Sequence, residues 1–179
     1  MISVATPADR TPIVRTLVAA FSSDPVLRHI FPDQEEYEHG AAAFFGHVFD
    51  KRVGMGAIWT VEGGVSVAIW EPPGTPPASS PLELPEPAAS RLRAYDEVVH
   101  AAFPESSYWY LGVLGTHPDH TGQGLGRAVM QAGLQRAAEA GLPAYLETAT
   151  RRNVALYERS GWKVVAEIDE PVPTWVMQQ

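Results

Sequence analysis

Apolar positions recur along this chain with two different spacings. Some stretches alternate apolar and polar residues, which is typical of strands, and others repeat every three to four residues, which is typical of helices. Because the two patterns follow one another along the chain, they predict a mixed α/β or α+β fold. A length of 179 residues is enough for one domain with a sizeable core. We therefore expect a single domain over residues 1–179.

The N-terminal third predicts one strand and three helices. Ile2-Ser3-Val4 is a short strand, and Thr6 is a good N-cap for a helix that runs to about Phe21. A short helix is expected within residues 22–33, and a long helix, mostly apolar on one side, over residues 35–53.

A hairpin and a proline-rich loop follow. The stretches "AIWTVE" and "VSVAIWE" flank Gly63-Gly64, which predicts an antiparallel pair with a two-residue glycine turn. Residues 72–87 contain seven of the 16 prolines and exclude helix or central strand there. A semi-rigid surface loop, able to act as a lid over a site, is favoured over a ligand for a proline-binding partner.

The C-terminal half predicts alternating helices and strands. One helix should run from Leu125 to Ala140, and a shorter one should be capped by Asn153 and end at Gly161. The remaining elements are a helix over 88–103 and strands over 106–116, 144–149, 162–168 and 174–179.

Composition and charge limit the classes of partner that this protein is expected to bind. No apolar stretch approaches the roughly 20 residues that span a bilayer, and the N-terminus lacks an export leader, so we expect a cytoplasmic protein without membrane contact. A formal charge of −8 without a basic cluster argues against nucleic acid and favours cationic small molecules. No cysteine is present, and His117 and His120 straddle a proline without further ligands nearby, so no metal site is expected.

The stretch "HPDHTGQGLG" carries the most specific signal. Its glycines, Gly122, Gly124 and Gly126, lie between a predicted strand and a predicted helix, where backbone N–H groups and the helix dipole bind anions. The spacing excludes a nucleoside-triphosphate loop, which needs Gly-Lys-Ser/Thr, and does not fit the dinucleotide fingerprint. A phosphate-bearing ligand is therefore favoured, and the alternative is that the glycines only allow close packing of strand and helix.

The same residues resemble the GCN5-related N-acetyltransferase (GNAT) family. Its pyrophosphate loop, Gln/Arg-x-x-Gly-x-Gly/Ala, is matched by residues 121–126, with Thr121 at the position usually held by Gln or Arg. Residues 141–169 and the closing "TWVM" are similar as well, most of all to actinobacterial members that look like puromycin N-acetyltransferase. The resemblance implies a twisted, mostly antiparallel mixed sheet of six to seven strands, flanked by helices, with a splayed strand pair that forms the cofactor slot.

The resemblance also implies acetyl-CoA as cofactor and a set of residues that contact it. These are expected at the end of the central strand, in the glycine loop and on the short helix: Leu114, Gly115, Thr116, Thr121, Gly122, Gln123, Gly124, Leu125, Gly126, Arg127 and Asn153.

Three catalytic roles are expected. An alkylamine is protonated at neutral pH and must lose a proton before it attacks, and Glu147, in the middle of a strand, is the candidate base. Its alternative is a solvent-facing or salt-bridged strand residue. The resemblance assigns the general acid to Tyr157, which could instead be a packed tyrosine with its hydroxyl in water, and the oxyanion contact to the backbone N–H of Leu114.

The sequence thus predicts an acetyl-CoA-dependent N-acetyltransferase acting on a small amine, such as an antibiotic-like or other xenobiotic amine, by direct attack through a tetrahedral intermediate. Two alternatives stay open: acetylation of protein or peptide amines, and a CoA-binding regulatory domain without turnover. A monomer or homodimer is expected, and the acceptor is not specified.

Overall fold

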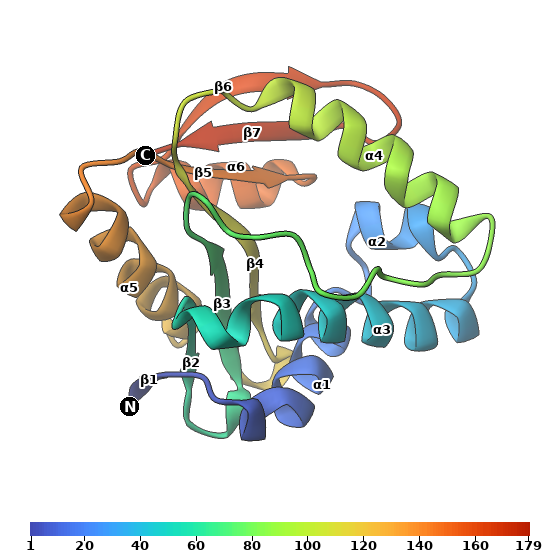
Figure 1. Cartoon of the computed structure of the whole chain (residues 1–179), viewed down its shortest axis with the longest axis horizontal. Coiled ribbons are helices and arrows are strands. Elements are labelled where there is room, and N and C mark those ends of the chain that lie inside the picture. Colours follow the sequence, from blue (N-terminus) through green and yellow to red (C-terminus); the bar gives the residue numbers. More distant parts are fainter.

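The computed structural model describes the backbone of residues 1–179 and every side chain except that of Glu62. Its centre is one seven-stranded sheet with the order β1-β2-β3-β4-β5-β7-β6 (Figure 1). All neighbouring strands are antiparallel except β4 and β5, which run parallel. The strands are β1 (Ile2–Val4), β2 (Ile58–Val61), β3 (Ser66–Glu71), β4 (Trp109–Thr116), β5 (Ala144–Thr148), β6 (Lys163–Ile168) and β7 (Thr174–Gln178).

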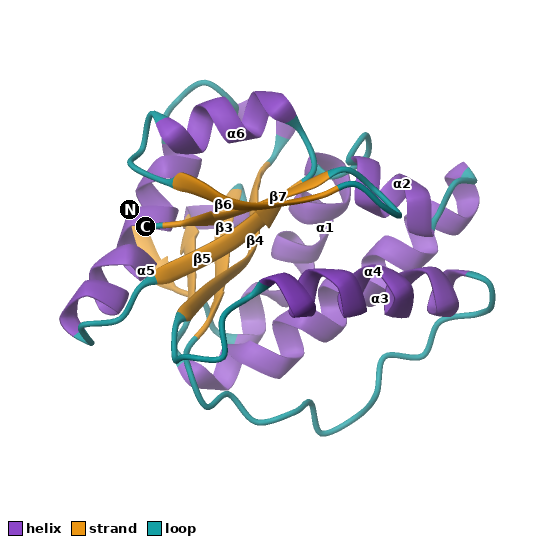
Figure 2. Ribbon diagram, turned by 90° about the horizontal axis from the view of Figure 1, so that it is seen from above, coloured by secondary structure: helices purple, strands orange, loops and turns teal.

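Helices cover both faces of this sheet. They are α1 (Arg10–Ala20), α2 (Pro25–Ile30), α3 (Gln34–Arg52), α4 (Ala88–Ala102), α5 (Leu125–Glu139) and α6 (Arg151–Glu158). Figure 2 shows α6 on one side of the sheet, and α3 and α4 on the other. The mixed sheet flanked by helices is the fold class that the sequence predicts.

Alternation along the strands explains the two layers. On β2 and β3, Ile58 and Ile69 pack into a core formed with α1 and α3, while Trp59 and Trp70 pack into a second core formed with α5. Successive strand residues point to opposite faces, so both faces of these two strands are buried. The near-continuous apolar runs of β2 and β3 are the sequence counterpart of this arrangement.

The hairpin turn and one helix cap differ from expectation. Residues 62–65 form a four-residue connection between β2 and β3, in which Gly63 and Gly64 both have positive φ, instead of a two-residue turn. Helix α6 begins at Arg151, and the Thr150 hydroxyl caps it by accepting a hydrogen bond from the backbone N–H of Asn153 at 3.2 Å. Asn153 is therefore not the cap, and its side chain needs no role in the helix start.

The segment between β3 and α4 matches its prediction. The proline-rich strap, residues 72–87, contains no helix or strand and connects β3 to α4 across the surface. Within the described chain, no helix is both long enough and apolar enough to cross a membrane.

The strands β4 and β5 separate soon after they meet. Their pairing comprises only Trp109 with Ala144 and Tyr110 with Tyr145. The β3–β4 register shifts so that Gly112 is the extra residue of a β-bulge, which bends β4. The predicted splayed strand pair is therefore present, and it leaves one edge of β4 open beyond Tyr110.

Candidate active site

Two adjoining cavities meet at the splay between β4 and β5. The larger encloses about 530 Å³ between α3, α4 and the proline-rich strap. The smaller, about 160 Å³, follows the open edge of β4 toward α6. Tyr110, Gly112 and Glu147 line both, so a molecule in one cavity can reach a molecule in the other at this point. We call the larger one the acceptor cavity and the smaller one the slot.

The slot has unpaired backbone groups along one wall. His117 donates its N–H to the Val65 carbonyl at 2.8 Å, which fixes the alternation of the β3–β4 ladder. The N–H of Gly115 therefore faces β3, and those of Leu114 and Thr116 face the open edge. An extended chain placed there could pair with β4 like an added strand. The ladder favours Leu114 and Thr116 over Gly115 for such contacts.

Gly115 has a packing reason of its own. A Cβ at this position would lie 2.6 Å from a methyl carbon of Leu17 and 3.2 Å from the Phe21 ring. Glycine is needed so that β4 can lie close to α1. Its place in the predicted cofactor set is explained by this contact without a ligand.

The glycine loop after β4 presents a row of free donors. Gly122 and Gly124 have φ values of 78° and 75°, and a Cβ on either would point into open space. Within the described chain, none of the backbone N–H groups of residues 122–127 donates a hydrogen bond. The loop lies at the N-terminus of α5, a helix of 15 residues, so the dipole adds positive potential. This arrangement suits a phosphate or pyrophosphate group.

The third glycine also serves packing. A Cβ on Gly126 would approach the Thr116 hydroxyl to 3.2 Å. That hydroxyl already hydrogen-bonds the Ser66 hydroxyl at 2.8 Å. The alternative explanation of the glycines as packing residues therefore holds at Gly126, whereas Gly122 and Gly124 are required by backbone conformation and open space.

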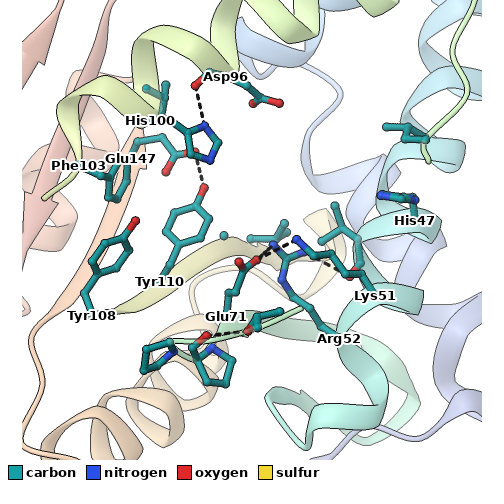
Figure 3. A pocket seen from close by; sticks show the side chains of 18 of the residues that line it. His47, Lys51, Arg52, Glu71, Asp96, His100, Phe103, Tyr108, Tyr110 and Glu147 are labelled. Atoms are coloured by element: carbon teal, nitrogen blue, oxygen red, sulfur yellow. Dashed lines mark hydrogen bonds and ion pairs between the residues drawn. The ribbon is translucent and has the colours of Figure 1, made fainter. Parts of the chain in front are cut away.

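Glu147 is the central side chain of the site. Tyr110 donates its hydroxyl hydrogen bond to Glu147 Oε1 at 2.7 Å, and the buried Oε2 has no partner among the described residues (Figure 3). Burial raises the pKa of Glu147 to about 7, although the Tyr110 hydrogen bond opposes the shift. No described cation forms an ion pair with it, so the salt-bridged alternative is wrong.

Tyr157 lies at the far end of the slot. Its side chain is buried on α6, with its ring edge-on to Trp162 at 6.0 Å between centroids. Burial, and then the charge of Glu147, raise the pKa of Tyr157. The hydroxyl therefore stays protonated at neutral pH and can donate a proton. Asn153, exposed one helical turn earlier, also lines the slot.

The other predicted cofactor residues surround the loop. Thr121 donates its hydroxyl hydrogen bond to the Pro118 carbonyl at 3.1 Å, which closes the turn before the glycines. Gln123 and Arg127 are exposed, and Leu125 is half-buried. Of the predicted cofactor residues, Leu114 and Asn153 line the slot together, whereas the others lie at the end of β4, in the loop that follows it and at the start of α5, outside the lining of the slot.

Sequence reasoning missed most of the acceptor cavity. Its wall includes Tyr110, Asp96 and His100 and, across the cavity, an ion-pair cluster of Lys51, Arg52 and Glu71 (Figure 3). These residues come from α3, β3, α4 and β4. No local motif links them, and only the charged end of α3, facing an isolated strand glutamate, could have suggested the cluster. The tryptophans Trp59, Trp70 and Trp109 are in the second core, whereas Tyr108 lines the cavity.

The two histidines before the glycine loop form a turn. His117 precedes a short 3-10 turn, Pro118–His120, that ends with His120, and the His117 ring accepts from the Asp119 N–H at 3.3 Å. Among the described residues, no cluster of three or more His, Cys, Asp or Glu side chains is placed to hold a metal ion.

Comparison with known proteins gives one family. The model described as the acetyltransferase (GNAT) family matches residues 13–162. A mycothiol acetyltransferase of Propionibacterium freudenreichii is 46% identical over 57 residues, 30% of this chain and 18% of that protein. The chain thus matches less than a fifth of the length of this curated relative.

Solved structures share the fold over the whole chain. A crystal structure of a protein described as histone acetyltransferase HPA2 and related acetyltransferase, from Corynebacterium glutamicum, has a TM-score of 0.69 and 25% identity, and covers 99% of this chain and 94% of that one. A Drosophila melanogaster polyamine N-acetyltransferase that forms N-acetylagmatine has a TM-score of 0.65 at 15% identity, over 99% and 97%. A Thermoplasma acidophilum PaiA N-acetyltransferase, crystallised with coenzyme A, has a TM-score of 0.67 at 8% identity, over 100% and 97%.

Proposed function

Because this chain belongs to the GNAT acetyltransferase family, we propose that it is an acetyl-CoA-dependent N-acetyltransferase acting on a small amine. The observation that carries this proposal is the position of Glu147. One of its oxygens is held by Tyr110, and the other is buried, unpaired and located where the slot meets the acceptor cavity.

The cofactor site fits its ligand in two places. GNAT enzymes use acetyl-CoA, and the N–H groups of residues 122–127 would bind its pyrophosphate. The open edge of β4, with the N–H groups of Leu114 and Thr116, would hold the pantetheine arm as an added strand. When bound, acetyl-CoA supplies a thioester carbonyl that the acceptor amine can attack.

Glu147 acts as the general base. A carboxylate with a pKa of about 7 is substantially ionised at physiological pH and is much more basic than an ordinary glutamate. It takes a proton from the acceptor ammonium, directly or through one water, as the amine reaches the junction of the two cavities. The hydrogen bond from Tyr110 holds the carboxylate in place while it receives the proton.

Leu114 and Tyr157 complete the machinery. The Leu114 N–H faces the slot and can donate to the oxyanion that develops on the carbonyl oxygen. Tyr157, protonated and at the slot's far end, donates a proton to the leaving sulfur. The register of the β3–β4 ladder and the position of Tyr157 in the slot lining support these two roles.

The acceptor cavity favours a small molecule over a protein chain. Its volume of about 530 Å³ is in the range of drug-sized ligand sites, and the proline-rich strap forms part of its wall. Antibiotic-like amines therefore belong in the substrate screen beside simple alkylamines, as do the polyamines named for the Drosophila neighbour.

A thiol-release assay tests the proposal. The protein is mixed with acetyl-CoA and a panel of antibiotics, polyamines, amino acids and peptides, and coenzyme A release is recorded with each. Acceptor-dependent release with small amines, and loss of release in Glu147→Gln, are expected. Coenzyme A binding without release for any amine would instead indicate a regulatory domain, and release with peptides alone would indicate a protein acetyltransferase.

A further inference from the structure

The wall of the acceptor cavity opposite Glu147 carries an unbalanced pair of cations. Lys51 and Arg52, at the end of α3, both contact the same oxygen, Oε2 of Glu71, with Lys51 Nζ at 3.5 Å. Two positive charges therefore share one carboxylate. The Arg52 side chain is only 8% exposed, and its Nε has no hydrogen-bond partner among the described residues. A buried guanidinium with an unused donor is costly unless a further acceptor approaches.

The positive potential extends into the cavity. His47, one turn before Lys51 on α3, also lines it, and its pKa is lowered first by burial and then by Lys51 and Arg52. The histidine is therefore mostly neutral near pH 7, and the net charge of this wall comes from the two cations and the one carboxylate, Glu71, that they share. Figure 3 shows Lys51, Arg52 and His47 on one side of the cavity, away from Glu147.

The opposite wall is acidic. Glu147 and Asp96 line the cavity there, and neither forms an ion pair with a described residue. Glu71 is on β3 and Glu147 on β5, two strands apart in the sheet, so regular strand spacing gives a separation of roughly 10 Å, and the splay of β5 from β4 makes it larger at Glu147. One elongated molecule can contact both.

The cofactor does not account for the cations. Glu71 pairs with Tyr110 at the start of β4, whereas the glycine loop follows Thr116 at its end. These ends are about 20 Å apart at the rise of a strand, and no residue of the loop lines the acceptor cavity. Phosphates bound at the loop therefore leave Lys51 and Arg52 free for another anion.

We propose that the acceptor is an amine that also bears an anionic group, with the ammonium at Glu147 and Asp96 and the anion, a carboxylate in the simplest case, at Lys51 and Arg52. This substrate class rests on the proposed N-acetyltransferase activity. The anion would balance the excess positive charge of Lys51 and Arg52, and the ammonium would balance the carboxylates of Glu147 and Asp96, which form no ion pair with a described residue. A molecule with both groups would therefore match the opposite charges of the two walls.

Matched acceptors test this assignment. Initial rates are measured with ω-amino acids of three, four and six carbons, with the amide of each, and with 1,6-diaminohexane. Because a hydrogen-bonded ion pair with a half-buried cation is worth roughly 10- to 100-fold in binding, kcat/KM for the preferred amino acid should exceed that of its neutral amide by this factor. The diamine should be the poorest of the three types.

Substitutions test whether Lys51 and Arg52 cause the preference for an amino acid over its neutral amide. Lys51→Gln should bring the acid-to-amide ratio close to one, while Lys163→Gln, the chain's other lysine, exposed on β6, should leave the ratio unchanged. Glu71→Gln removes the competing carboxylate and should raise the ratio. Equal rates for acid and amide in the unmodified protein, or an equal loss for all acceptors in Lys51→Gln, would overturn the inference while the activity stands. Absence of acetylation with every amine tested would overturn the proposed function itself.

Discussion

The cofactor side of this molecule offers backbone groups to its ligand, whereas the acceptor side offers side chains. On the cofactor side, the donors are backbone N–H groups of β4 and of residues 122–127, in one continuous stretch of chain. On the acceptor side, the working groups are side chains on α3, β3, α4, β4 and β5, which the fold brings together from distant parts of the sequence. Glu147 lies where the two sides meet.

This difference decides how each side can change. A backbone donor is retained whatever side chain it carries, so the cofactor side is sensitive to conformation and space, and glycine positions are its weak points. The acceptor side can be altered one side chain at a time without disturbing the loop. Substitutions on each side can test this division, and the residue at the junction should show the largest effect.

The largest effect is expected for Glu147→Gln. The amide preserves size and one hydrogen-bond acceptor but cannot take a proton, so turnover at pH 7 should fall by roughly 10²- to 10⁴-fold. The pKa of about 7 means that the unmodified protein loses activity as pH falls below 7, because the base becomes protonated. The variant should lack this limb and recover only as the amine, with a pKa near ~10.4, deprotonates on its own.

A matched carboxylate serves as the control. Glu167→Gln removes an exposed strand glutamate on β6 and should leave the pH–rate profile unaltered. If Glu147→Gln retains the profile and rate of the unmodified protein, the carboxylate is structural and the junction needs another base.

On the cofactor side, Gly124→Asp should abolish tight binding of acetyl-CoA. It places a carboxylate beside the row of unpaired N–H groups and imposes a φ near 75° on a residue with a Cβ. We expect the dissociation constant measured by calorimetry to rise by roughly 100-fold or more, as like charges meet where phosphate would bind. Gly141→Asp, at the other end of α5, with a φ of 66° and open space around it, is the matched control and should keep affinity. Equal losses in both variants would point to helix destabilisation instead of a phosphate site.

The same division explains how far the sequence could predict the fold. Periodicity identified every strand, because each is a local apolar run bounded by turn residues or glycine. The prediction of a two-residue turn was wrong, because the connection comprises residues 62–65. A glycine pair indicates positive φ but does not fix the number of residues in the connection. The cap of α6 was assigned three residues late, because Thr150 and Asn153 are both good caps and only the observed hydrogen bond distinguishes them.

The candidate site was predictable to a different degree on each side. The glycine loop is one local motif with a backbone function, so sequence and resemblance together indicated it. Tyr110, Lys51 and Glu71 gave no comparable signal, because their roles depend on the bulge at Gly112, the length of α3 and the splay of β5. Which side of β4 carries free N–H groups likewise depends on the ladder register, and this is why Gly115 could not be separated from Leu114 in advance.

A smaller effect than that of Glu147 is expected for Tyr157→Phe. The ring packs edge-on to Trp162 and should hold its place, so melting temperature and acetyl-CoA affinity should change little. Turnover should fall by roughly 10²-fold, the usual scale for loss of a general acid. Thioesters with leaving thiols of lower pKa need less help from a proton donor, so they should narrow the gap between the variant and the unmodified protein. A gap that is constant across leaving groups, or a large loss of affinity, would make Tyr157 a binding residue.

The smallest and most diagnostic change is Tyr110→Phe, which links the two sides through Glu147. The Tyr110 hydroxyl donates to the carboxylate at 2.7 Å and thereby stabilises its charged form, which holds the pKa below the value that burial alone would give. Removing the hydroxyl should raise the pKa of Glu147 above about 7, so less of the base is ionised at pH 7 and the acidic limb of the pH–rate profile moves to higher pH. We expect a several-fold loss of rate at pH 7 that disappears near pH 9, where the carboxylate is ionised in both proteins. Tyr108→Phe alters another cavity tyrosine, which has no hydrogen bond to Glu147. This variant should show no loss of activity that is confined to low pH. A loss for Tyr110→Phe of equal size at every pH would show that Tyr110 orients Glu147 without tuning it, because geometry, unlike protonation, does not recover as pH rises.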